Sequence, residues 1–261
     1  MRLQLCTWQE VDSYLVRSKG IIVPVGSTEQ HGPNGLIGTD AICPETIANG
    51  VAKEIDVLVA PTLSIGMAQH HMAFAGTITF RPSTFIAVVK DVVASLARHG
   101  FERVYFLNGH GGNIATLGAA FSEIYADRSI GGDPTALGQE QAGLAPGRPA
   151  PVRCRLANWF MGPTTRALAR ELFGSSEGSH ATPSEVSLSW YAHPDFVKEA
   201  QISPKVAPTG EFVDAADYRR RFPDGRIGSD PSLASVEAGE RLFRAAVADV
   251  VKDYTAFLAA A

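Results

Sequence analysis

Two carboxylates and an imidazole lie within twelve residues in the first part of the chain. Glu29, His31 and Asp40 are joined by a stretch rich in glycine and proline, which lets the backbone turn tightly and bring donors on both sides together. Carboxylate oxygen and neutral imidazole nitrogen together suit divalent Zn²⁺, Mn²⁺ or Fe²⁺. Taken alone, this segment is equally consistent with a metal site and with a solvated polar loop.

A second histidine, His110, lies in the glycine-rich run NGHGGN at residues 108–113. The run follows an apolar segment and precedes a helical pattern, as a phosphate-binding loop of a nucleotide-binding or redox protein would. It matches neither GxGxxG nor GxxxxGKS/T, so that interpretation is disfavoured. A histidine that only hydrogen-bonds its own turn stays open, but two polar loops at one sheet edge favour a metal site.

A third polar segment, GSHATPSE, occupies residues 178–185. Its His180 is a candidate for a second titratable group of a hydrolytic site. Its Glu185 has two interpretations. With Thr182 it forms a capping-box pattern that would begin a helix at Pro183, or it supplies a further carboxylate to the site. The spacing of these residues alone does not decide whether Glu185 caps the helix or binds a metal ion.

The elements that position these residues alternate between short apolar runs and longer amphipathic ones. Such alternation predicts a mostly parallel sheet covered by helices on both faces, with ligands gathering beyond the carboxyl ends of the strands. The first two polar segments directly follow expected strands. The expected strands are 21–25, 57–63, 104–107 and 152–158, and the expected helices are 42–53, 82–100, 114–126, 164–173, one from 183, and 232–260.

The composition narrows the class of protein. The 261 residues suit one α/β domain spanning 1–261, with a loop insertion predicted at about 129–151. A net charge of -4 gives no electrostatic footprint for nucleic acid. The N-terminus does not resemble a signal peptide, and no run reaches the roughly 18 apolar residues that a membrane helix needs. Three cysteines without CxxC spacing indicate a reducing compartment, so we expect a cytoplasmic protein.

The three polar segments together resemble the signature blocks of the creatininase family. The matching runs are PVGSTEQHGPNGLIGTD at 24–40, NGHGGN at 108–113 and GSHATPSEVS at 178–187, with a weaker HHMAFAGTITF at 70–80. The resemblance implies a three-layer α/β/α sandwich with a mostly parallel central sheet. It also implies a homohexamer with a binuclear metal centre of two divalent ions, most often Zn²⁺, with Mn²⁺ or Fe²⁺ as alternatives.

The resemblance also implies a role for each matching residue. Glu29 and His110 would bind one metal ion, His31 would bind the other, and Asp40 would bridge both. The creatinine-hydrolysing branch takes a further ligand from a glutamate at the position of Gly112, so this departure puts creatinine itself in doubt. Members with glycine there can use the glutamate that corresponds to Glu185, and His180 matches the catalytic histidine. A second departure, Asn34-Gly35, alters the mouth of the pocket.

The implied activity is that of a metal-dependent amidohydrolase. It would cleave a carbon–nitrogen bond of a small cyclic amide, or of a related amide or formamide, through a metal-bridging hydroxide. His180 would protonate the leaving nitrogen, and His71, Trp159 and Phe74 are candidate pocket walls, although Phe74 is better explained as a core residue. Two alternatives stay open, a peptide-maturation hydrolase of the same family and a non-catalytic metal-binding accessory protein.

Overall fold

The computed structural model describes residues 1–130 and 152–260. The loop insertion predicted at 129–151 therefore lies almost entirely outside the described residues. In the described part of the chain, four parallel strands form one sheet in the order β2-β1-β3-β4. Their bounds are Gly20–Val25 for β1, Leu58–Val59 for β2, Arg103–Asn108 for β3 and Arg153–Asn158 for β4.

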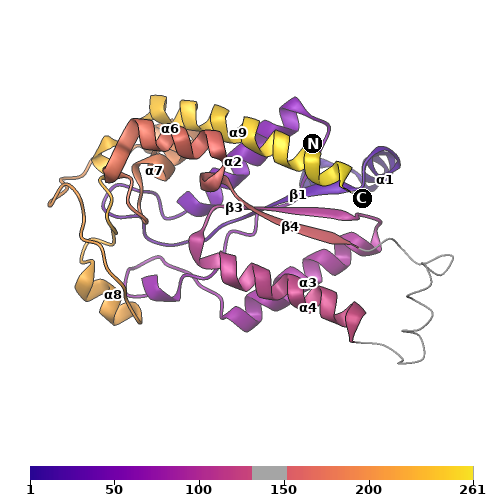
Figure 1. The fold of residues 1–261 in the computed structure, drawn as a ribbon, viewed down its shortest axis with the longest axis horizontal. Helices are drawn as coiled ribbons and strands as arrows, with labels where there is room; N and C mark the ends of the chain where they lie inside the picture. Colours follow the sequence, from indigo (N-terminus) through magenta and orange to yellow (C-terminus); the bar gives the residue numbers. More distant parts are fainter. Residues whose placement is uncertain (131–151, 261) are drawn as a thin grey trace.

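Helices cover both faces of this sheet (Figure 1). One layer holds α3 (Pro82–Arg98) and α4 (Ile114–Ser129), and the other holds α2 (Thr39–Glu54), α6 (Pro163–Phe173), α7 (Pro183–Ala192) and α9 (Val236–Ala259). The helix α1 (Trp8–Arg17) lies near the amino ends of the strands, and α8 (Ala215–Arg221) lies beyond their carboxyl ends. The expected three-layer α/β/α sandwich with a parallel sheet is confirmed.

The strands are apolar throughout because both of their faces are buried. In β1, Ile21 and Val23 pack with α3 and α4, whereas Ile22 between them packs with α2 and α9. In β3, Phe106 packs in the core with α3 and α4, and Tyr105 packs in the core with α2 and α9. Side chains alternate across a strand, so a strand covered on both faces needs a continuous apolar run instead of an alternating one.

Two predicted elements have different bounds in the structure. The strand expected over 57–63 is regular only at Leu58–Val59. Pairing with β1 continues at Ala60, whose amide donates to the Ile22 carbonyl oxygen at 2.8 Å, and then at Leu63, whose amide donates to the Pro24 carbonyl oxygen at 3.0 Å. Two residues of β1 thus face three residues of this segment, and the extra residue interrupts the regular ladder. The last helix begins at Val236, later than expected, because the Ser235 side chain accepts the Ala238 amide at 3.1 Å and caps it there.

The second helix, α2, begins three residues earlier than its apolar spacing indicated. Its first turn therefore includes Asp40, one of the candidate metal ligands. The helices α1 and α8 were not predicted. Among the described helices, none combines the length and the apolar character needed to cross a membrane.

Candidate metal centre and active-site cavity

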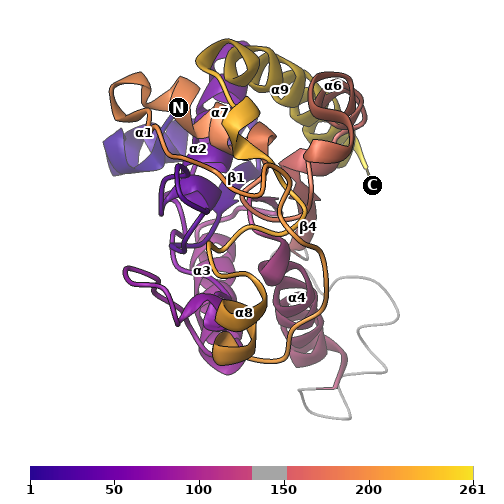
Figure 2. The same ribbon diagram turned by 90° about the vertical axis from the view of Figure 1, so that its left-hand side faces the viewer.

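Polar segments far apart in the chain meet beyond the carboxyl ends of the strands. Glu29 and His31 follow β1, His110 follows β3, and Asp40 lies in the first turn of α2. Glu185 comes from the first turn of α7. Figure 2 looks onto this end of the molecule, where loops and α8 gather around the strand ends. The sheet topology thus brings together residues that are up to about 150 positions apart.

Asp40 lies between two imidazoles. Its Oδ1 is 3.1 Å from His31 Nε2, and its Oδ2 is 3.0 Å from His110 Nδ1. A separation of about a nanometre between Asp40 and His110 would have excluded a shared centre, and the observed distance is well below that. Each oxygen of one buried carboxylate therefore faces a different histidine, as a bridging ligand requires.

The close approach of α2 to the end of β3 depends on a glycine. A Cβ atom at Gly109 would lie 2.1 Å from the carbonyl oxygen of Asp40 and 2.7 Å from Pro44 Cδ. Any side chain at this position would push the start of α2 away from the strand. The glycine beside His110 is thus needed to bring the carboxylate of Asp40 to the imidazole.

Glu29 is fully buried and is the second carboxylate of the centre. Its Oε2 accepts a hydrogen bond from Ser27 Oγ at 2.8 Å and lies 3.3 Å from His110 Nε2. Its Oε1 lies 3.1 Å from His71 Nε2 and 3.8 Å from His180 Nδ1. Histidines from three different segments therefore surround this one carboxylate.

The potential ligand atoms form overlapping groups in which all atoms lie within 4.8 Å of one another. Glu29, Asp40 and His110 form one group, and His31, Asp40 and Glu185 form another, so Asp40 belongs to both. A further group joins Glu29 and His31 with His180. The first two groups have the membership expected of a two-ion site with a shared aspartate.

The position of Glu185 is consistent with both a helix cap and a metal ligand. Its Oε1 accepts the Thr182 amide at 2.6 Å and its own amide donates to Thr182 Oγ1 at 3.2 Å, which completes the capping box of α7. It also belongs to the group with His31 and Asp40. Because the cap uses Oε1, the cap leaves the other carboxylate oxygen available, and it holds that side chain at the centre.

The charges of the centre are strongly coupled. Burial alone raises the pKa of Asp40, but His31 and His110 outweigh burial and hold that pKa well below its usual range. Burial likewise lowers the pKa of each imidazole, but Asp40 raises that of His31 to about 10, and Glu29 with Asp40 raises that of His110 to about 9. Without a cation the two rings thus balance the buried carboxylates, and a bound metal ion would displace those protons.

Gln30 links the centre to His71. Its Oε1 accepts the Gly32 amide at 2.8 Å, so its amino group faces the other way. There Nε2 lies 2.9 Å from the Gly225 carbonyl oxygen and 2.9 Å from His71 Nδ1. If Gln30 donates to Nδ1, the proton of His71 is on Nε2, where it faces Glu29. Burial also lowers the pKa of His71, to about 3, so this ring is neutral.

His180 is held by the backbone of the same loop. Its Nε2 lies 2.9 Å from the Gln30 carbonyl oxygen, and a carbonyl can only accept, so we assign the ring proton to Nε2. The Nδ1 atom then has a free lone pair and faces Glu29. Burial, with His71 and His31 nearby, lowers the pKa of His180 well below its ordinary value. The following residue, Ala181, has a φ of 52°, a strained conformation of the kind found at functional sites.

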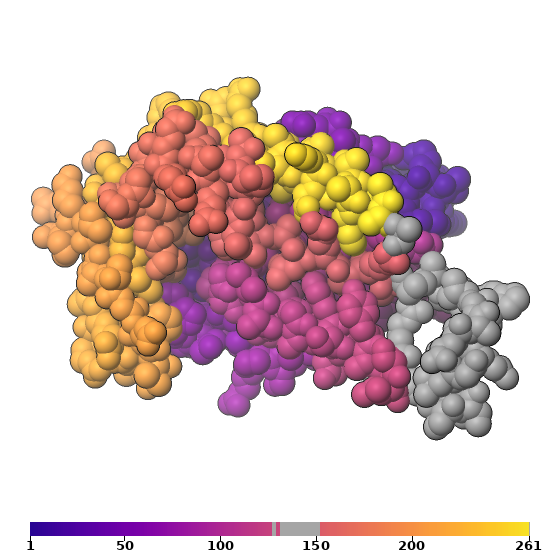
Figure 3. Space-filling model, viewed as in Figure 1, coloured from indigo at the N-terminus to yellow at the C-terminus, as the bar shows by residue number. Residues whose placement is uncertain are grey.

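A cavity of about 580 Å³ opens onto the centre. Asp40, His110, His180 and Glu185 lie on its wall, and so do His71 and Trp159, the two predicted substrate-binding residues. In Figure 3 the surface is hollowed between the magenta start of α4 and the salmon α6, and α6 is one element of the cavity wall. Phe74 does not line the cavity but packs in a small cluster with Tyr218.

Sequence reasoning missed several residues of the cavity and its surroundings. Gln30 had a signal, since it lies between two candidate ligands, but nothing in the spacing indicated its bridging role. Glu177 lines the cavity, accepts a hydrogen bond from Ser184, and has its pKa raised by burial to about 7. Tyr218 comes from α8, has no motif around it, and its ring centroid is 4.6 Å from that of His71.

The chain is similar to known hydrolases over most of its length. The family model for creatinine amidohydrolase matches residues 4–254. A mycofactocin precursor peptide peptidase of Mycolicibacterium smegmatis is 32% identical over 233 residues, which cover 85% of this chain and 79% of that protein.

Solved structures share the fold at low sequence identity. A crystal structure of creatinine amidohydrolase is 22% identical, with a TM-score of 0.79 over 100% of this chain and 98% of the other. A mutant creatininase of Zn-Zn type is also 22% identical, with a TM-score of 0.77 over 99% and 98% of the two chains. The expected fold and the expected enzyme class, a hydrolase of carbon–nitrogen bonds, agree with these matches. This chain belongs to the creatinine amidohydrolase family.

Proposed function

We propose that this protein hydrolyses the carbon–nitrogen bond of an amide with the help of two divalent metal ions. The observation that carries the proposal is the pair of ligand groups that share Asp40. Glu29 and His110 would hold one ion with it, and His31 and Glu185 would hold the other. A single buried carboxylate flanked by two such groups is the arrangement of two-metal hydrolases.

The residues fit such ions in two respects. Glu29 Oε1 and Asp40 Oδ2 are buried and receive no hydrogen bond of suitable geometry, so they have acceptor capacity that a cation would use. The donors are carboxylate oxygen and imidazole nitrogen, which suit Zn²⁺, Mn²⁺ or Fe²⁺. Zinc is our first choice, and the Zn-Zn type of one solved creatininase supports it.

The chain itself supplies the proton transfer. When bound, the metal ions would polarise the carbonyl group and lower the pKa of the water nucleophile. As water adds to the carbonyl carbon, His180 Nδ1 takes the proton into its free lone pair. It then donates this proton to the departing nitrogen while the carbon–nitrogen bond breaks, which leaves a carboxylic acid and an amine. The acid then gives its remaining proton to the amine, so the products are a carboxylate and an ammonium ion. The contact from His180 Nε2 to the Gln30 carbonyl oxygen holds the ring in the tautomer that this transfer needs.

Two substrate types are compatible with this chemistry. The family name and the creatininase structures support a small cyclic amide or a related amide or formamide. The similarity to a precursor-peptide peptidase over 85% of this chain supports a peptide bond. A non-catalytic metal-binding protein is the weaker alternative, because such a protein has no need of a histidine in the position of His180.

The test combines metal analysis with a substrate screen. We expect up to two Zn, Mn or Fe ions per chain, and ring opening, formate or peptide cleavage in a screen of cyclic amides, ureides, formamides and short peptides. Asp40→Ala should lose both ions and all activity. His180→Ala should keep the ions but lower kcat at least about 100-fold. Asp12→Ala, at an exposed position of α1, is the control and should change neither property.

Two outcomes would contradict the proposal. One is undiminished hydrolysis after the metal has been removed exhaustively by chelation. The other is an Asp40→Ala variant that binds metal as the unmodified protein does.

A further inference from the structure

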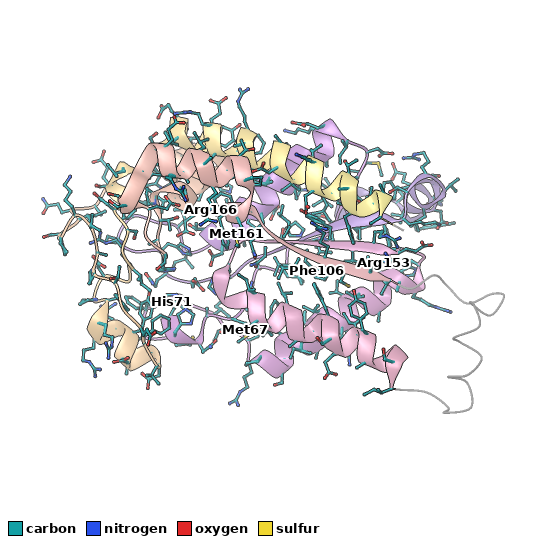
Figure 4. The ribbon with its side chains drawn as sticks, viewed as in Figure 1. Met67, His71, Phe106, Arg153, Met161 and Arg166 are labelled. Carbon is teal, nitrogen blue, oxygen red and sulfur yellow. The ribbon has the colours of Figure 1, made fainter. Side chains whose placement is uncertain are left out.

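Two arginines on α6 line the same cavity as the candidate metal centre. Arg166 and Arg170 are four residues apart, so they lie on one face of the helix, and Ala169 beside them also lines the cavity. The small alanine leaves room between the helix and the centre. In Figure 4, Arg166 lies on the side of α6 that faces the strand ends, with His71 on the far side of that region.

Neither guanidinium has a partner within the described part of the chain. No ion pair or hydrogen bond joins Arg166 or Arg170 to a side chain, although other arginines are paired, such as Arg226 with Asp224 at 2.7 Å. Glu177 lies on the wall of the same cavity but accepts a hydrogen bond from Ser184 instead. Both arginines are at exposed positions, so two solvated positive charges line the cavity without a partner among the described residues.

The chemistry of these groups indicates what they bind. A guanidinium presents a planar fork of N–H donors that matches the two oxygens of a carboxylate. The three carboxylates of the centre, those of Glu29, Asp40 and Glu185, would be occupied by the metal ions and the reacting amide. A carboxylate elsewhere on the substrate would therefore be held by cations on another part of the cavity wall, and the arginine pair supplies them. A neutral cyclic amide has no use for the pair.

We propose that Arg166 and Arg170 bind a carboxylate of the substrate, so that the natural substrate is a carboxylate-bearing amide. This inference rests on the proposed function, because the reacting amide must reach the metal centre while its carboxylate reaches α6. Trp159 and Phe160, which also line the cavity, provide an apolar wall for the part of the substrate in between. An N-acyl amino acid or a short peptide has this layout.

The test compares pairs of probes that differ only in charge. N-acetyl amino acids and short peptides with a free C-terminal carboxylate are compared with their carboxamides, for binding by calorimetry and for hydrolysis by the metal-loaded enzyme. We expect the carboxylate form to bind about tenfold more tightly. Arg166→Gln and Arg170→Gln should each reduce this preference, and the double variant should abolish it.

The kinetic consequence should fall mainly on KM. Because the arginines would hold a part of the substrate remote from the reacting bond, their loss should raise KM more than it lowers kcat. Arg98→Gln, an exposed arginine on α3 that does not line the cavity, is the matched control and should keep the full preference. Amidated peptides that carry a single aspartate distinguish a side-chain carboxylate from the C-terminal one.

The outcomes separate this inference from the proposed function. Equal binding of acid and amide, or a preference that survives in the double variant, would overturn the carboxylate site. The latter result would mean that the metal ions alone bind the acid. Hydrolysis of neutral amides without an acid preference leaves the proposed function intact, whereas an arginine-dependent preference without any hydrolysis contradicts the proposed function alone.

Discussion

At the scale of single residues, the lack of room for a side chain at Gly112 bears on the role of Glu185. A Cβ atom at Gly112 would lie 2.4 Å from His110 Nε2, so a side chain there would have to turn the imidazole away from its present position. The glutamate that the creatinine-hydrolysing branch is expected to use at this position is therefore incompatible with this ring orientation. We therefore propose that the remaining ligand comes from another segment, and Glu185, which lies in one group with His31 and Asp40, is the candidate.

Two substitutions separate the structural role of Glu185 from its ligand role. Glu185→Gln can still accept the Thr182 amide, so it should keep α7 capped but reduce the number of tightly bound metal ions from two to one. Thr182→Ala removes the cap and should destabilise the protein by about 1 kcal/mol while both ions stay bound. Metal analysis and urea unfolding measure the two effects. Two ions retained in Glu185→Gln would show that Glu185 is only a cap.

At the scale of elements, the position of α6 depends on an acid from another helix. Asp249 of α9 accepts the Thr165 amide at 2.9 Å and the Thr164 amide at 3.2 Å, and thus caps the first turn of α6. Burial alone raises the pKa of Asp249, but the hydrogen bonds from Thr165 and Thr164 outweigh it and lower that pKa. Since α6 carries Arg166 and Arg170, this contact also orients one wall of the cavity.

Removing the Asp249 cap should lower stability in a pH-dependent way. We expect Asp249→Ala to cost about 1 kcal/mol at pH 7. The folded pKa of Asp249 lies below its unfolded value of about 3.9, so its contribution is complete above that value and is lost as the pH falls through the folded pKa. Urea unfolding at pH 7 and near pH 3 should therefore show a difference that shrinks in acid. Asp91→Ala, an exposed acid on α3, serves as the control. A pH-independent difference would contradict the cap.

At the scale of the whole molecule, the surface carries exposed apolar side chains near the N-terminus. Leu5, Trp8 and Val16 are 73%, 71% and 86% exposed. Exposed apolar side chains of this kind are available for contact with a second copy of the chain. This exposure supports the homohexamer that the family resemblance implies, which we keep as a proposal.

The assembly is tested by its mass. We expect sedimentation velocity at micromolar concentration to give a main species with six times the mass of one chain. The same measurement after metal removal shows whether the assembly depends on the ions. We expect that it does not, because α1, which carries Trp8 and Val16, lies at the opposite end of the molecule from α8 and the carboxyl ends of the strands (Figure 1). A main species with the mass of one chain would show that the hexamer is wrong.

The sequence by itself determined the layers of the fold and, through its motifs, indicated the candidate ligands, with Glu185 left open between ligand and cap. Apolar runs such as residues 21–25 and 104–107 are typical of strands buried on both faces, and polar loops after parallel strands gather at one sheet edge. The motifs around Glu29, His110 and His180 are each a short contiguous run, so each can be recognised in the sequence without a structure. The end of β2 was not predicted, because the extra residue before Leu63 depends on which hydrogen bonds the neighbouring strand offers.

Only the tertiary structure decided how these residues face one another. Asp40 lies between His31 and His110, and Gln30 contacts both His71 and His180, only because elements distant in the chain pack together. The same packing brings to the cavity wall two arginines of α6 that have no partner among the described residues. Local spacing determines which face of a helix a residue occupies, but long-range packing determines what that face meets. The kind of chemistry at the site could therefore be predicted from the sequence. The charged groups that face each candidate ligand, and the residues that line the cavity, could not.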